Sequence, residues 1–267
     1  MNEVSIPGLN LFNLYQYILI FFFASLRISA LLLSAPFFST GFIPLQIRII
    51  LGVCVTTFIF LEIKIPNVID MNAFKMIIII LSEIGIGLSV GLVLSILFSV
   101  ASVAGEKIAS TAGLSMANMI DPQSGGQTLV ISTVLSLFLI SIFLSLDGHL
   151  YIIKMIIESY VYLPIGASLN FLEISNVGII AFEKMLYLSS LVMLPVVGGM
   201  LLINIAGGII TRSAPTLNLF SFIFPITLIS VFIFLFLALG SIGNAFSDLT
   251  ALCINIIDNV LHSGIVE

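Results

Sequence analysis

Charged side chains are scarce in this sequence, where 8 basic and 13 acidic residues make up 8% of the 267 positions. Soluble domains carry about 25% charged residues, so the composition excludes an ordinary soluble domain. With a net charge of −5, the few lysines and arginines provide no basic face able to neutralise phosphates. Nucleic acid is therefore not an expected partner.

Histidine and cysteine are rarer still, with two of each. His149 and His262 have no cysteine or second histidine at metal-ligand spacing, and the chain contains neither a G-x-S-x-G nor a phosphate-loop motif. Cys54 and Cys253 lie far apart inside apolar segments, where a buried free thiol is the expected state. We expect no catalytic residues, no metal, no cofactor and no enzymatic activity.

Apolar residues take the place of the missing charge and make up 60% of the chain. A hydrocarbon core about 30 Å thick needs about 20 apolar helical residues, which predicts an all-α membrane protein with about six long hydrophobic helices. The apolar runs lie near residues 11–34, 45–63, 76–104, 128–146, 179–210 and 217–242. Arg27, Arg48 and Glu83 fall inside these runs, and because a charge at mid-helix is costly, they should face protein or water. Much of the bundle should therefore be covered by partners.

The fourth apolar run is followed directly by Asp147, Gly148 and His149. We interpret Asp147 and His149 as the membrane boundary and a turn, in which Gly148 permits the bend. A catalytic role for Asp147 and His149 is the alternative.

The end of the chain differs in pattern from the rest. Apolar residues recur there at three- and four-residue spacing between polar ones, as in an amphipathic helix; they are Phe246, Leu249, Cys253, Ile256 and Val260. Its polar face is acidic and would be repelled by anionic lipid headgroups. We therefore separate a helical membrane domain, residues 1–243, from a C-terminal amphipathic helix or tail, residues 244–267. The tail is either a docking surface for protein or a simple interfacial anchor.

Two groups of glycines mark candidate helix-packing faces. Helices in lipid associate where small residues let their backbones approach closely. Gly87 and Gly91 form one such face in the third run, and Gly199, Gly207 and Gly208 form another in the fifth. The close neighbour is either another helix of this chain or another subunit.

A stretch of small and polar residues at 105–127, GEKIASTAGLSMANMIDPQSGGQ, lies between two long apolar runs. The string AGEKIASTAGLSMANMIDPQS, followed by DGHL and LPIG, resembles the FliR family of flagellar export-gate proteins and its injectisome relatives. Further matches agree in order from about residue 25 to 230; they are Arg27, Ala35-Pro36, Pro44, Arg48, Asn204, Gly208, Arg212, Ala214-Pro215, Leu217-Asn218, Phe220 and Pro225. Two positions depart from the pattern, because Ala109 and Phe224 stand where glycines are expected.

The resemblance implies a non-enzymatic subunit of the type III, flagellar-type, protein export gate in the bacterial cytoplasmic (inner) membrane, at the flagellar basal body. It implies kinked helical hairpins packed in a multi-subunit helical ring with FliP-like and FliQ-like subunits, and contact with FlhB-like and FlhA-like export components and with membrane lipid. That ring would be the entry pore for unfolded protein substrates. A secondary transporter or a purely structural ring component is the alternative. The interruptions at Pro195 and Pro225 have no counterparts in the first half of the chain, which disfavours a transporter.

A pore for unfolded chains must hold ions at rest, and irregular backbone at membrane depth is tolerated only where protein or a water-filled cavity surrounds it. We therefore predict that residues 110–122 form a pore plug, or gasket, in which flexible methionines close the contact. Its candidate residues are Gly113, Ser115, Met116, Met119, Asp121 and Pro122. The alternative is an ordinary solvent-exposed loop between helices.

Polar and proline residues with expected structural roles are Arg27, Arg48, Glu106, Asn204, Arg212 and Pro215. Glu106 and Lys107 are adjacent and do not share a helix face, so a structural or interfacial role for Glu106 is favoured over proton transfer. Pro215 disfavours helix at the residue before it and predicts a break. Arg212 either binds free carbonyls at the preceding helix end or marks the membrane surface.

Overall fold

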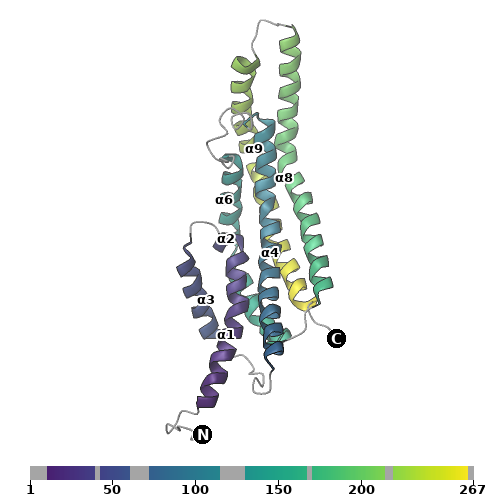
Figure 1. Ribbon diagram of the computed structural model, residues 1–267. Helices are drawn as coiled ribbons and strands as arrows, with labels where there is room; N and C mark the ends of the chain where they lie inside the picture. Colours follow the sequence, from purple (N-terminus) through teal and green to yellow (C-terminus); the bar gives the residue numbers. More distant parts are fainter. Residues whose placement is uncertain are drawn as a thin grey trace. The chain divides into compact units, whose positions relative to one another are not determined.

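The computed structural model describes residues 11–39, 43–60, 72–114, 130–166, 170–213 and 219–263. Within these ranges every regular element is an α-helix and no residue lies in a strand, which confirms the predicted all-α class. The helices (Figure 1) are α1 (Leu11–Ser34), α2 (Pro36–Ser39), α3 (Leu45–Ile59), α4 (Ala73–Thr111), α6 (Val130–Ser145), α7 (Gly148–Tyr162), α8 (Phe171–Ser213) and α9 (Leu219–Ser263).

Four of these helices, α1, α4, α8 and α9, are long and apolar enough to cross a membrane. Together α6 and α7 form a fifth candidate, bent by 63° at the break between them. The run at 45–63 gives only α3, whose 15 residues are fewer than the about 20 that a hydrocarbon core requires. The described part of the chain therefore has four or five long apolar helices, where the sequence predicted about six.

The boundaries of two helices differ from the apolar runs. Helix α4 continues past residue 104 to Thr111, because the small residues that follow the run are packed: Gly105 lies against the backbone of Ser132 in α6, and Ala109 is fully buried. Helix α7 was not among the predicted runs. Lys154 and Glu158 interrupt its apolar pattern, and they form an exposed ion pair of 3.6 Å on one face of the helix.

The chain divides into two compact units. Unit 1 contains Met1–Ser95, His149–Ile180 and Cys253–Glu267, and unit 2 contains Ile96–Gly148 and Ala181–Leu252.

The core of unit 1 is built on one face of α1. Ile20, Phe23, Ala24, Ile28 and Leu31 recur at three- and four-residue spacing and are each at most 3% exposed. Helix α1 packs against α2 and α3, and α3 lies beside it in Figure 1. The short helix α3 thus covers α1 within unit 1.

Helices α1 and α4 approach each other closely along the predicted Gly87 and Gly91 face. A Cβ atom added at Gly87 would collide with the carbonyl oxygen of Arg27, and one added at Gly91 would collide with the side chain of Ser34. The hydroxyl of Ser95 donates a hydrogen bond of 2.8 Å to the Ser34 carbonyl. The neighbour of this glycine face is therefore α1 of the same chain.

The core of unit 2 contains α6, α9 and the second half of α4. The rings of Phe98 and Phe143 meet edge to face with centroids 5.0 Å apart, and those of Phe138 and Phe246 lie 5.9 Å apart. Both Phe143 and Phe246 are fully buried. Aromatic rings therefore join α6 to α4 and to α9.

The bend after α6 depends on two residues in different ways. Asp147 adopts the left-handed backbone conformation, with φ of 55°, and so makes the turn. Gly148 is needed for space, because an added Cβ would collide with the ring of Phe143. The expectation that the freedom of Gly148 permits the bend is thus corrected.

Candidate functional site

The first residues of the stretch 110–122, which the sequence predicted to plug the pore, form the end of α4 and its glycine cap. Gly113 has φ of 80°, a conformation that glycine adopts without steric cost. Its N–H donates to the Ser110 carbonyl at 3.1 Å, and the N–H of Leu114 donates to the Ala109 carbonyl at 3.0 Å. This pair of hydrogen bonds is the Schellman motif, which closes a helix at a left-handed residue.

Side chains from two other helices bind the remaining carbonyls at this end of α4. The Nδ2 group of Asn204, in α8, donates to the Thr111 carbonyl at 3.2 Å. The hydroxyl of Thr227, in α9, lies 3.3 Å from the Ala112 carbonyl. A helix end leaves four carbonyls without partners in its own helix. All four, from residue 109 to residue 112, are bonded here, and we call this arrangement the α4 cap.

Phe224 and Gly113 are neighbours beside the α4 cap. A Cβ on Gly113 would lie 3.5 Å from the Phe224 ring. Thr227 is 5% exposed, whereas Asn204 lies on an exposed face of α8. Every residue of the α4 cap belongs to unit 2, and together they fix the position from which the chain leaves α4.

The three glycines predicted to pack in α8 divide into two kinds. A Cβ at Gly199 would lie 2.7 Å from the Phe234 ring, and one at Gly207 would lie 3.0 Å from Ile223. These two glycines therefore face α9 in unit 2. Gly208 is exposed and has open space beside it.

Arg27 is a fully buried charged group of unit 1, at 0% exposure. Its Nε donates to Glu83 Oε2 at 2.8 Å and its Nη2 to Glu83 Oε1 at 3.2 Å. Its Nη1 donates to the Ser159 hydroxyl at 2.8 Å, and Nη2 also donates to the Leu163 carbonyl at 2.9 Å. One guanidinium thus joins α1 to α4, to α7 and to the turn after α7.

The same cluster includes an aromatic ring and a backbone amide. The guanidinium lies 4.1 Å from the centroid of the Tyr160 ring, within the range of a cation–π contact. The Tyr160 hydroxyl donates to the Ala24 carbonyl at 2.8 Å, and the Gly166 N–H donates to Glu83 Oε1 at 3.4 Å. We call these residues, with Arg27, Glu83, Ser159 and Leu163, the Arg27 cluster.

The sequence indicated part of the Arg27 cluster and part of the α4 cap. Arg27 and Glu83 stood out as charges in apolar runs, and Asn204 as a residue of the family pattern. Tyr160 and Thr227 were missed, because a tyrosine or threonine in an apolar helix carries no signal of its own.

The other predicted positions lie outside the Arg27 cluster and the α4 cap. Arg48 donates from Nε and Nη2 to the Ile43 carbonyl, at 3.2 and 3.0 Å, at the start of α3. Glu106 is exposed on α4, and Arg212 is exposed in the last turn of α8. Positions outside the described residues are Ser115, Met116, Met119, Asp121, Pro122 and Pro215.

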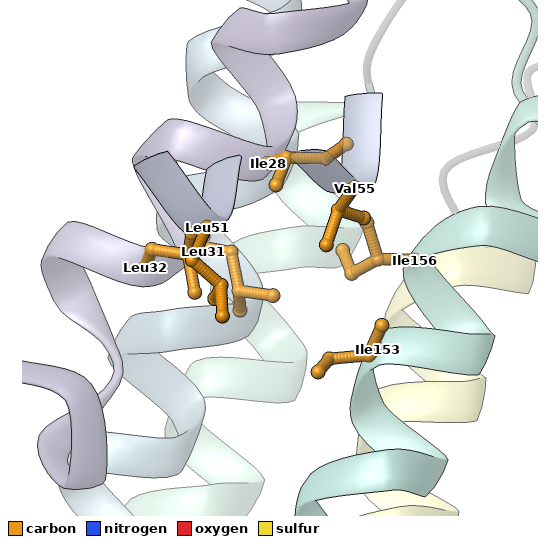
Figure 2. Close-up of a pocket in the computed structure, with 7 residues that line it drawn as sticks. All are labelled: Ile28, Leu31, Leu32, Leu51, Val55, Ile153 and Ile156. Carbon is orange, nitrogen blue, oxygen red and sulfur yellow. The ribbon is translucent and has the colours of Figure 1, made fainter. Parts of the chain in front are cut away.

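A small apolar cavity of about 10 Å³ lies in unit 1 between α1, α3 and α7. Figure 2 shows the side chains that line it, which are Ile28, Leu31, Leu32, Leu51, Val55, Ile153 and Ile156. A volume of this size holds at most one water molecule, and an aliphatic lining offers water no partner. The cavity is therefore a packing gap and not a ligand site.

Residues 18–252 match the model of the family described as bacterial export proteins, family 1. The chain belongs to this family. Flagellar biosynthetic protein FliR of Pectobacterium carotovorum subsp. carotovorum is 32% identical over 223 residues, which cover 82% of this chain and 84% of that protein. FliR of Escherichia coli (strain K12) is 30% identical over 213 residues, covering 78% and 80%.

A protein named for translocation and not for flagellar biosynthesis is also similar to the chain. Yop proteins translocation protein T of Yersinia pestis is 29% identical over 160 residues, which cover 59% of this chain and 61% of that protein. The resemblance to the FliR family and its injectisome relatives is confirmed. The chain is thus a multi-helix membrane protein of a bacterial export family with flagellar and type III members.

Proposed function

We propose that this chain is a non-enzymatic subunit of the type III, flagellar-type, export gate in the bacterial inner membrane, where it helps to form and seal the entry pore for unfolded proteins. The observation that carries the proposal is the match to bacterial export proteins, family 1, over residues 18–252. The α4 cap supports the proposal, because a plug over residues 110–122 would begin at a helix end whose carbonyls are hydrogen-bonded to α8 and α9.

The proposed partners are FliP-like and FliQ-like subunits in a helical ring, together with FlhB-like and FlhA-like components. Support comes from the apolar surfaces that unit 2 leaves exposed on α8 and α9, among them Leu202, Ile209, Phe236 and Leu237. Asn204 is also exposed on α8, and its amide has one hydrogen bond in the described structure. Because an amide is poorly solvated by lipid tails, a protein neighbour fits this face better than lipid does.

We propose that the C-terminal segment binds a protein partner through its polar side. Helix α9 continues unbroken through residue 244 to Ser263, and the five apolar residues of the predicted amphipathic pattern are all buried in the chain. Asp248, Asn255 and Asn259 remain exposed. A partner at this segment would therefore meet a polar, acidic surface.

The plug is tested by deleting residues 115–120 in cells that carry the whole export apparatus. The deletion spares the α4 cap, which ends at Leu114. A pore crossing about 30 Å of hydrocarbon leaks ions unless it is narrowed or dewetted, so we expect higher ion conductance with assembly largely intact. Replacing both Met116 and Met119 by Ala should act in the same direction. An assembled deletion complex that is as ion-tight as the parent would contradict the plug and favour an ordinary loop.

A further inference from the structure

Thr227 in α9 has two acceptors for a single hydroxyl hydrogen. Its Oγ1 lies 2.9 Å from the Phe224 carbonyl in its own helix and 3.3 Å from the Ala112 carbonyl at the end of α4. A threonine hydroxyl donates one hydrogen, so this hydrogen is shared or exchanged between the two carbonyls. Thr250 differs, because within the described residues its hydroxyl bonds only to the Phe246 carbonyl of α9, at 2.9 Å.

We infer that Asn204 and Thr227 are positioning residues that hold the last turn of α4, and that Thr227 can release this turn without losing its own hydrogen bond. At membrane depth no bulk water replaces a lost partner, so a free carbonyl or hydroxyl is costly. Rotation of the Thr227 hydroxyl toward Phe224 leaves no donor unsatisfied. The released state then lacks one partner at the Ala112 carbonyl, while the Thr111 carbonyl keeps its hydrogen bond from Asn204.

The inference rests in part on the proposed function. The predicted plug, residues 110–122, begins in the last turn of α4, so the position of that turn sets where the plug starts. The Schellman hydrogen bonds close only the Ala109 and Ser110 carbonyls. The Thr111 and Ala112 carbonyls are bonded by side chains of α8 and α9, so a movement of either helix would change the hydrogen bonds at the end of α4.

The test uses Thr227→Val, which keeps the shape of the side chain and removes the hydroxyl, in the assembled complex. Hydrogen exchange of the Gly113 and Leu114 amides measures opening of the α4 cap. Loss of one hydrogen bond should raise their exchange about fivefold, and Thr227→Ser should exchange like the parent. Thr250→Val is the matched control, because Thr250 is also buried on α9 and its hydroxyl donates to a carbonyl of its own helix.

Asn204→Leu is a second variant, used in case Thr227→Val fails to fold. Because Asn204 is exposed, its replacement should not disturb folding. It should raise exchange at the same amides. Parental exchange at Gly113 and Leu114 in both Thr227→Val and Asn204→Leu would overturn the inference. If the 115–120 deletion leaked ions in that case, the proposed function would still stand. If exchange is faster in the two variants but the deletion does not leak ions, the positioning role of Asn204 and Thr227 is supported and the proposed pore-sealing function is contradicted.

Discussion

Arg27 and Glu83 place two opposite charges at 0% exposure within apolar helices. Such a pair is costly to bury, and well-packed apolar residues often replace it without loss of stability. The Arg27 guanidinium nevertheless makes four hydrogen bonds, two of them outside the ion pair, to Ser159 and Leu163. A planar fork is required for this geometry, and a lysine ammonium does not reproduce it.

Removing one partner of this ion pair should be more damaging than removing both. Glu83→Leu leaves the Arg27 charge uncompensated, and we expect a loss of about 3–5 kcal/mol of stability. Arg27→Met combined with Glu83→Leu should recover part of it. Thermal unfolding of the purified complex in detergent measures both variants. The exposed pair of Lys154 and Glu158 is the control, because Glu158→Leu should change stability by less than about 1 kcal/mol. Equal loss in the single and double variants would contradict the role of charge.

Helices α1 and α4 pack more tightly than leucine-rich faces allow, because Gly87 lies against the Arg27 backbone and Gly91 against the Ser34 side chain. Glycine normally weakens a helix by about 0.5–1 kcal/mol relative to alanine. At Gly87 that cost is offset by a contact that no larger residue permits.

Gly87→Ala should therefore destabilise the protein although alanine favours helix. The added Cβ meets the Arg27 carbonyl, which is backbone and cannot rotate away. Gly178→Ala in α8 is the control, since open space surrounds that position, and it should be neutral or stabilising by about 0.5–1 kcal/mol. Protein yield and thermal unfolding would compare the two. A Gly87→Ala protein as stable as the Gly178→Ala protein would contradict the close approach.

The sequence predicted the helical class and most helix positions because long apolar runs have one stable form in lipid. It did not predict that α4 continues to Thr111, since small residues such as Gly105 and Ala109 look like loop residues until a neighbour covers them. Helix α7 was missed because charged residues on its exposed face hide its apolar pattern.

Pairings between distant residues were the least predictable part of the site. Arg27 and Glu83 are separated by 56 residues, and Asn204 and Thr111 by 93. Periodicity places each residue on a helix face but carries no information about which face meets it. The family resemblance marked Arg27 and Asn204 as important without naming their partners.

Extensive apolar surfaces on α8 and α9 predict that the chain is stable only when it is bound to partner subunits. Co-expression with FliP-like and FliQ-like subunits should give a single complex of defined stoichiometry, whereas the chain alone should be unstable or aggregated. Co-purification followed by size-exclusion chromatography and mass measurement checks both outcomes. A monodisperse, thermally stable monomer of the chain alone would contradict the dependence on partners.

The lengths of α8 and α9 limit how much of each helix lipid can surround. With 43 and 45 residues and a rise of about 1.5 Å per residue, each has a contour of about 65 Å. The hydrocarbon layer is about 30 Å thick, so a helix of this length that crosses it once, even at a steep tilt, continues well beyond the acyl chains. The apolar side chains there would face water unless other subunits cover them, so the proposed ring should stand partly above the bilayer plane.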